Sequence, residues 1–152
     1  MAGAGIVKAL YNESEYESIL DALSKASPDD LFAVADAAGG ELHYISAKAF
    51  EKGKDPVTGR SWAKVKGTPA KGTKTLWRSA HLKDSLDWEA ASDGTVVFGS
   101  NVEYARIHQM GGKTGRNHAA KIPKRPYMGV PRDFNRRFFN DPEILKLLGL
   151  GG

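Results

Sequence analysis

The spacing of apolar residues predicts two helices in the N-terminal third of the chain. After the candidate cap Asn12, apolar side chains recur at helical intervals and predict a helix over about 13–25. Ser27-Pro28-Asp29-Asp30 is a strong helix start, and the apolar stripe that follows it continues to about Lys52. Gly39-Gly40 weakens the middle of this second helix by about 1 kcal/mol per glycine. We therefore expect a kink or a close helix crossing there.

The helical periodicity stops between residues 53 and 75. Proline and glycine turn chemistry replaces it, in a polar segment rich in lysine. We expect a basic extended loop, which is too long to be a passive connection in a compact domain. Two explanations stay open, namely a functional segment and one that is disordered until a partner binds.

Shorter elements follow in the C-terminal half. We expect a short helix over 76–86, a β-hairpin of strands 86–90 and 95–98, and a short helix over 103–110 that ends at Gly111-Gly112. A further strand pair is expected from 119–122 and 127–130, and a terminal helix over 131–148, interrupted near Asp141-Pro142. The predicted fold is α+β, with two N-terminal helices, a small mainly antiparallel sheet and a C-terminal helix, in a single domain spanning 1–152.

Charge is distributed unevenly along the chain, although the net charge is only +4. Residues 1–51 carry three basic and nine acidic side chains, whereas residues 52–83 carry nine basic side chains and only Asp55 as an acid. Residues 104–125 add six basic groups and no acid. Such polarity suits either nucleic-acid contact or head-to-tail association between copies of one protein.

Composition favours a soluble protein folded in a reducing cytoplasm. The chain of 152 residues has no cysteine, which excludes disulfides, thiolate metal sites and thiol nucleophiles. Its N-terminus lacks the features of a signal peptide, and no apolar run approaches the roughly 20 residues of a membrane span. We expect no membrane contact.

Candidate catalytic chemistry is weak throughout. The four histidines form no His-Glu-x-x-His array, and no serine lies in a Gly-x-Ser-x-Gly turn. Gly111-Gly-Lys-Thr-Gly115 has the residue types of a phosphate loop, but it lacks the Walker spacing and context, so a turn is the better interpretation. Helix capping explains Asp29-Asp30. We expect no catalytic residue, no cofactor and no metal, and hence no enzyme.

Nucleic-acid binding is the main alternative. The basic segments 52–83 and 104–125 contain aromatic residues, among them Trp62 and Trp77, that are able to stack on bases while lysine and arginine contact phosphates. The spacing of these aromatic residues is also that of core anchors.

Four sequence blocks in a fixed order carry a family resemblance. They are FEKGKDPVTGRSW (50–62), LKDSL (82–86), VFGSNVEYARIHQMGG (97–112) and IPKRPYMG (122–129). In this order and spacing the chain resembles the phage virion morphogenesis family, which includes Mu-like assembly proteins and P2-like tail-completion proteins. The resemblance covers roughly residues 14–148. Ser79-Ala80-His81 departs from the Thr-Gly or Ser-Gly turn that is usual there.

The resemblance implies a non-enzymatic structural protein of a tailed phage or prophage. It would complete the tail or join it to the head, located in the tail or neck of the virion and in the host cytoplasm during assembly. Its partners would be tail or head-tail connector proteins and further copies of itself, with a ring as one arrangement. In the leading hypothesis the acidic N-terminal third of one copy meets the basic loop or hairpin of the next.

Six residues of these blocks are the candidate interface. Tyr104 and His108 would lie on neighbouring faces of one short helix. Arg125 precedes Pro126, which favours an extended backbone, and its planar donors suit carboxylates on an adjacent subunit. The complete candidate set is Arg60, Trp62, Tyr104, His108, Arg125 and Tyr127. The alternative, that Tyr104, Ile107, Pro126 and Tyr127 are simply core residues, stays open.

Overall fold

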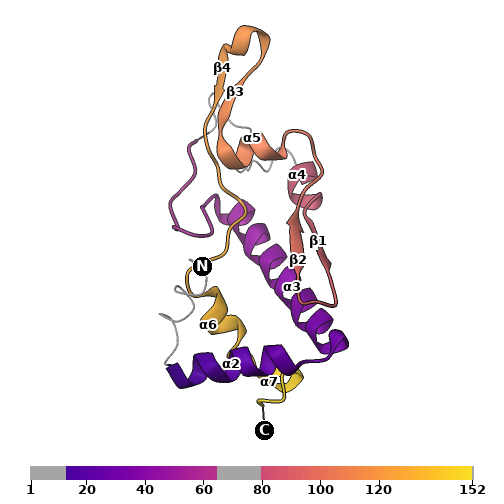
Figure 1. The fold of residues 1–152 in the computed structure, drawn as a ribbon. Coiled ribbons are helices and arrows are strands. Elements are labelled where there is room, and N and C mark those ends of the chain that lie inside the picture. Colours follow the sequence, from indigo (N-terminus) through magenta and orange to yellow (C-terminus); the bar gives the residue numbers. More distant parts are fainter. Residues whose placement is uncertain (1–12, 65–79, 152) are drawn as a thin grey trace. The chain divides into compact units, whose positions relative to one another are not determined.

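The fold is α+β, as predicted, and the chain forms two compact units. The computed structural model describes residues 13–64 and 80–151. Unit 1 falls within Met1–Gly39, Glu89–Val97 and Arg132–Gly152, and unit 2 within Gly40–Trp88 and Phe98–Pro131. The long helix α3 and the first β-hairpin, both labelled in Figure 1, contribute residues to both units by their residue ranges. The predicted single domain stays a prediction.

The two predicted N-terminal helices are confirmed as α2 (Glu13–Lys25) and α3 (Pro28–Lys52). Ser27 caps α3, since its hydroxyl oxygen accepts from the Asp30 backbone N–H at 3.1 Å. Helix α3 continues without a break through Gly39 and Gly40. The close approach predicted there is made by a side chain of the first β-hairpin rather than by a second helix, because a Cβ on Gly40 would lie 3.8 Å from the Trp88 ring.

Unit 1 contains both C-terminal helices, α6 (Phe134–Phe138) and α7 (Pro142–Leu147). Between them the Asp141 carboxylate accepts from the Glu143 backbone N–H at 2.9 Å, and Pro142 occupies the first helical turn. The predicted interruption of the terminal helix is therefore confirmed. The unit buries apolar side chains from four helices, namely Ile19, Val34, Ala35, Phe134, Phe138, Ile144 and Leu148.

The predicted first hairpin is confirmed as β1 (Asp87–Ala90) and β2 (Val96–Gly99). Its turn is closed by the Ala91 N–H, which donates to the Thr95 carbonyl at 2.8 Å, and by Gly94 in the left-handed region at φ 90°. On one side of the hairpin the rings of Trp88 and Phe98 lie against His43 of α3, with centroids 5.4 and 6.5 Å away.

Unit 2 is built around a core of seven buried residues: Ala49, Phe50, Trp62, Leu82, Leu86, Ala105 and Tyr127. Leu82 lies on the short helix α4 (Ala80–Asp84), within the range where a short helix was predicted. The predicted basic loop is described only as far as residue 64. That part folds back on itself through a bridge between Lys54 and Ser61. The remainder of the predicted loop, with its predicted disorder, lies outside the described residues.

The last elements of unit 2 correct one prediction. Helix α5 (Ala105–Met110) is followed by strand β3 (Gly112–Thr114), the 3-10 turn η2 (Arg116–His118) and strand β4 (Ala120–Ile122). Strand β4 was expected, but it pairs with β3 and not with 127–130, which is irregular. The segment Gly111–Gly115, interpreted as a turn, thus contributes a strand. Among the described helices, none combines the length and apolar character needed to span a membrane.

Candidate assembly interface

The end of helix α5 is packed backbone to backbone against the segment that follows β4. Gly111 has φ 72° and its N–H donates to the Ile107 carbonyl at 2.7 Å. A Cβ at Gly111 would lie 2.9 Å from the Lys124 backbone nitrogen, closer than real Cβ atoms come. Glycine is therefore required twice at this position, for its positive φ and for the close approach.

Gln109 forms side-chain hydrogen bonds with the backbone after Pro126, where a neighbouring strand would otherwise form them. Its side-chain oxygen accepts from the backbone N–H groups of Tyr127 at 2.9 Å and Met128 at 3.0 Å. Its side-chain nitrogen donates to the Met128 carbonyl at 2.9 Å. One amide thus satisfies three backbone groups that a neighbouring strand would otherwise pair. This explains why 127–130 forms no strand, and sequence reasoning overlooked Gln109 although it lies inside the third sequence block.

Tyr127 is a core residue of this region, with an exposed fraction of 0%. Its hydroxyl donates to the Ala105 carbonyl at 2.7 Å, and its ring centroid lies 5.2 Å from that of Phe50. Burial raises the pKa of the Tyr127 phenol to about 12. The side chain therefore stays neutral and fastens α5 to the segment after Pro126.

Arg125 and Trp62 hold the described end of the 53–64 segment against the same region. The Arg125 side chain is buried and donates to the backbone carbonyls of Ala63 at 2.9 Å and Lys64 at 3.2 Å. The Trp62 indole N–H donates in the opposite direction, to the Pro126 carbonyl at 2.7 Å. Burial lowers the pKa of the Arg125 guanidinium from its usual value. Both polar groups thus serve internal hydrogen bonds between segments far apart in sequence.

His108 lies half-buried on α5, edge-on to the Tyr104 ring with centroids 5.8 Å apart. Its Nδ1 is buried and accepts or donates no hydrogen bond among the described residues. Burial, followed by the positive charge of Arg125, lowers the pKa of the imidazole below its ordinary value. The arrangement therefore favours the neutral imidazole over the charged form. The described residues also contain no group of three or more metal-ligating side chains.

The structure brings five of the six candidate interface residues into this one region and leaves Arg60 in the exposed turn before Trp62. We call the region formed by α5 and residues 123–129 the platform. Trp62, Arg125 and Tyr127 are buried, whereas Tyr104 is exposed at its edge. The interface role of these six residues stays a prediction. The polar side-chain groups of Trp62, Arg125 and Tyr127 donate hydrogen bonds to carbonyls of the same chain.

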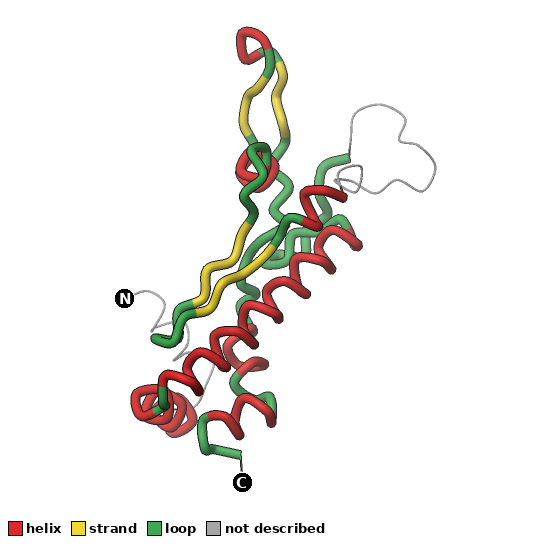
Figure 2. The backbone as a smooth tube through the Cα atoms, turned by 90° about the vertical axis from the view of Figure 1, so that its right-hand side faces the viewer, coloured by secondary structure: helices red, strands yellow, loops and turns green. Residues whose placement is uncertain are grey.

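An exposed hairpin arm extends from the platform (Figures 1 and 2). The arm comprises β3, η2 and β4, and every residue from 112 to 121 is exposed. Its register pairs Gly112 with Ile122, Lys113 with Lys121 and Thr114 with Ala120. At the tip, Asn117 and His118 have φ 58° and 54°, a region that few non-glycine residues occupy. The arm thus displays its side chains and its strand edges to solvent.

Comparison with known proteins identifies the family. A model of the phage virion morphogenesis family matches residues 11–142. The curated protein "Mu-like prophage FluMu G protein 2" of Haemophilus influenzae is 32% identical over 120 residues, which cover 77% of this chain and 78% of that protein. No solved structure matches the chain. The family match spans the platform and the arm, and the chain belongs to the phage virion morphogenesis family.

Proposed function

We propose that this protein completes the phage tail or joins it to the head, as a non-enzymatic component of the tail or neck. Family membership places the chain in phage virion assembly, and therefore among other virion proteins. The finer position is supported by the four ordered sequence blocks, which resemble those of a family that includes P2-like tail-completion proteins as well as Mu-like assembly proteins. The observation that carries the proposal is that two of the four blocks, 97–112 and 122–129, build the platform that presents the exposed arm.

The chemistry of the platform supports a structural role. Gln109, Arg125 and Tyr127 direct their polar atoms to backbone groups of the same chain. Burial and the nearby Arg125 lower the pKa of His108, and among the described residues His108 shows no carboxylate partner of the kind that a typical catalytic histidine has. Rigid internal hydrogen bonding of this kind is what a protein needs in order to hold a contact surface in a fixed shape.

Self-association is part of the proposal. Residues 1–51 are acidic and residues 104–125 are basic, so copies of the chain carry complementary surfaces. A contact between two different surfaces is heterologous and closes into a ring when the rotation between copies permits it. A ring at the end of the tail is therefore the arrangement we propose for the assembled particle.

Deletion of the gene in an inducible phage tests the proposed function. We expect electron micrographs of the lysate to show heads and tails that are separate or incompletely joined, with few infectious particles. Expression of the wild-type chain from a plasmid should restore joined particles. A normal yield of joined, infectious particles from the deletion phage would overturn the proposal.

The non-enzymatic part of the proposal needs a separate test. The His108→Gln variant is used for it in the same complementation experiment. If the protein is structural, the variant restores particles as long as it folds. Because His108 is also a candidate interface residue, the non-enzymatic part of the proposal would be contradicted only by a folded His108→Gln protein that still self-associates as the wild type does and yet forms no particles.

A further inference from the structure

The arm contains local features that are unfavourable in an isolated chain. Lys113 and Lys121 are directly paired across the two strands, and like charges in this position destabilise a hairpin. A two-stranded hairpin without a covered apolar face is itself marginal in water. The tip adds two non-glycine residues in the left-handed region. Such conflicts between local preference and observed structure concentrate at functional sites.

The charges of the arm indicate an anionic partner. Lys113, Arg116 and Lys121 are exposed, and none of them has an ion pair with the part of the chain that the structure describes. No Asp or Glu occurs between Glu103 and Asp133. A carboxylate or phosphate placed between the two paired lysines would turn their repulsion into two attractions.

Helix α2 carries neighbouring acidic residues, the opposite of the arm's basic residues, on an exposed surface of unit 1. Glu17 and Asp21 lie one turn apart, and like charges at this spacing weaken a helix by about 0.2–0.5 kcal/mol. Leu20 lies beside them with 43% of its surface exposed. We call Glu17, Leu20 and Asp21 the acidic face. It belongs to a segment, residues 13–39, with seven carboxylates and Lys25 as its only basic residue.

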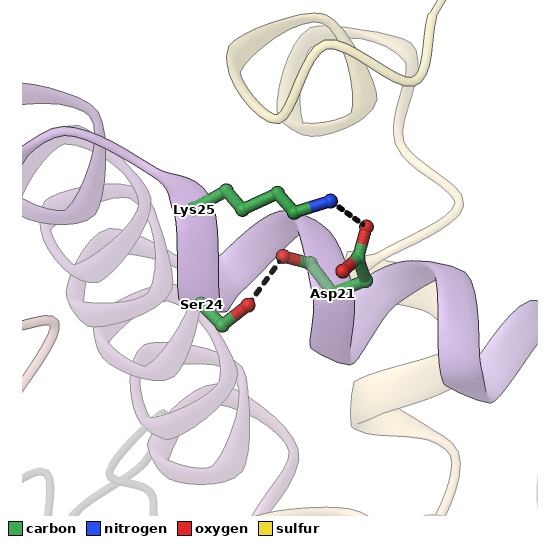
Figure 3. A network of polar contacts seen from close by, with 3 residues as sticks. All are labelled: Asp21, Ser24 and Lys25. Carbon is green, nitrogen blue, oxygen red and sulfur yellow. Dashed lines mark hydrogen bonds and ion pairs between the residues drawn. The ribbon is translucent and has the colours of Figure 1, made fainter.

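The acidic face is able to accept a new cation. Asp21 pairs with Lys25 at 3.0 Å, while the Ser24 hydroxyl donates to the Asp21 carbonyl at 2.7 Å (Figure 3). Both side chains of the ion pair are largely exposed, and exposed pairs of this kind contribute little to stability. Replacement of Lys25 by an incoming lysine or arginine as the partner of Asp21 therefore costs little free energy.

We propose that the arm of one copy docks on the acidic face of a second copy. The inference rests on the proposed function, in which self-association serves assembly, and it names the two surfaces that meet. Each surface has an apolar residue near its charges, namely Leu20 on the acidic face and Met110, which is 60% exposed, at the foot of the arm. Apolar contact with charged residues around it is the usual anatomy of a protein interface. Because the two surfaces differ, a copy that uses its arm in one contact still has its acidic face available for the next copy.

Duplex DNA is the competing anionic partner. Its phosphates would also relieve the repulsion between Lys113 and Lys121. The acidic segment 13–39 of the same chain would, however, repel DNA and would have no role in that complex. Association between copies uses both charged surfaces, which is why we favour it.

Charge reversal tests the pairing of the two surfaces. We expect the wild type to associate at 50 mM salt in sedimentation-equilibrium runs and to dissociate at 500 mM, because salt screens exposed charges. The arm variant K113E/K121E and the face variant E17K/D21K should each associate roughly tenfold more weakly or worse. The quadruple variant, with both surfaces reversed, should recover association. The matched controls K52E/K54E and E89K/E103K change the net charge equally at exposed residues outside both surfaces and should behave as the wild type.

Cross-linking tests where the arm lies. Because the chain has no cysteine, Ala119→Cys creates a single thiol on the arm for a benzophenone maleimide. After illumination of a mixture of ¹⁵N-labelled and unlabelled protein, we expect cross-linked peptides that join the arm of one copy to residues 13–39 of the other. Circular dichroism confirms that each variant is folded.

Several outcomes would overturn the inference. These are a wild type that stays monomeric at every salt concentration, cross-links that map elsewhere, a quadruple variant that does not recover, or duplex DNA binding that depends on Lys113 and Lys121 without any self-association. A wild type that stays monomeric would also remove self-association from the proposed function. The role in completing or joining the tail is tested separately, because its failure is seen as normal particles from the deletion phage.

Discussion

The two hairpins of this protein have similar lengths and very different surroundings. In the hairpin of β1 and β2, Trp88 and Phe98 lie against His43 of α3, so one face is covered. In the arm of β3 and β4, every residue from 112 to 121 is exposed. A covered apolar face stabilises a hairpin from within the chain, whereas an uncovered one depends on its base or on a partner. The first hairpin therefore belongs to the fold, and the arm is available for recognition.

The two hairpins are also fixed at different places. The first hairpin is closed at its turn by Asp93, whose carboxylate accepts from the Thr95 N–H at 2.9 Å, and by Gly94. The arm is instead fixed at its foot, where Gly111 packs on Lys124 and Gln109 holds the segment after Pro126. Stability of the arm's foot and exposure of the arm itself are thus separable properties, and mutations can be chosen to affect one without the other.

Trp88→Ala should give the largest effect on stability. It removes the side chain that covers Gly40 and His43, and we expect the free energy of unfolding to fall by about 2–3 kcal/mol, because Trp88 is half-buried. Urea denaturation followed by circular dichroism measures this. The control is Val97→Ala on the same hairpin, where Val97 is 67% exposed, and its effect should stay below about 0.5 kcal/mol. Equal effects of the two changes would show that the first hairpin is no better covered than the arm.

Tyr127 should make the free energy of unfolding fall at alkaline pH. The folded state raises the phenol pKa from 10.0 to about 12, so it holds the proton more tightly than the unfolded state does. Stability from this group is complete below pH 10 and is lost as the pH rises toward 12, by about 2–3 kcal/mol in total. Denaturation of the wild type and of Tyr127→Phe between pH 9 and 12 measures the difference. If the stabilities of both proteins fall in parallel, the prediction is wrong.

Gln109→Ala should loosen the foot of the arm. Three backbone groups of Tyr127 and Met128 lose their partner in a partly buried position, at a cost of about 1–3 kcal/mol. We expect faster hydrogen exchange at the Tyr127 and Met128 amides, together with the lower stability. Gln109→Glu is the matched control for exchange, because it keeps the acceptor for both N–H groups. Unchanged exchange in Gln109→Ala would contradict the role assigned to Gln109.

His108 should give a smaller effect in acid. Its folded-state pKa is lowered, so its contribution to stability is present above pH 6.5 and is lost as the pH falls through 6.5 toward the lowered value. Melting temperatures between pH 8 and 5 are expected to fall less steeply for His108→Gln than for the wild type. A wild type that becomes more stable over the same interval would show that the imidazolium is favoured in the fold.

Replacement of the arm should have the smallest effect on stability. Joining Gly112 to Ile122 through Asn-Gly removes the exposed residues 113–121 and leaves the core of unit 2 intact. We expect the melting temperature to change by only about 2 °C, which corresponds to a few tenths of a kcal/mol. Self-association should nevertheless be lost. A large drop in melting temperature would show that the arm is part of the fold after all.

The sequence by itself determined the helices, the first hairpin and the family. Ser27 and Pro28 start α3, Asp141 and Pro142 start α7, and the turn at Asp93-Gly94 closes the hairpin. In each of these cases the residues that specify the structure are neighbours along the chain, so local rules are sufficient. The four ordered blocks indicated the family, which the comparisons confirm.

Only the tertiary structure decided the strand pairing of the arm and the partners of the platform residues. Strand β4 pairs with β3 and not with 127–130, because Gln109 already satisfies the backbone at 127 and 128 and Pro126 contributes no N–H. Arg125 and Trp62 lie 63 positions apart in sequence, yet each donates to a carbonyl beside the other. Contacts over such separations depend on how the whole unit packs, and no local pattern encodes them.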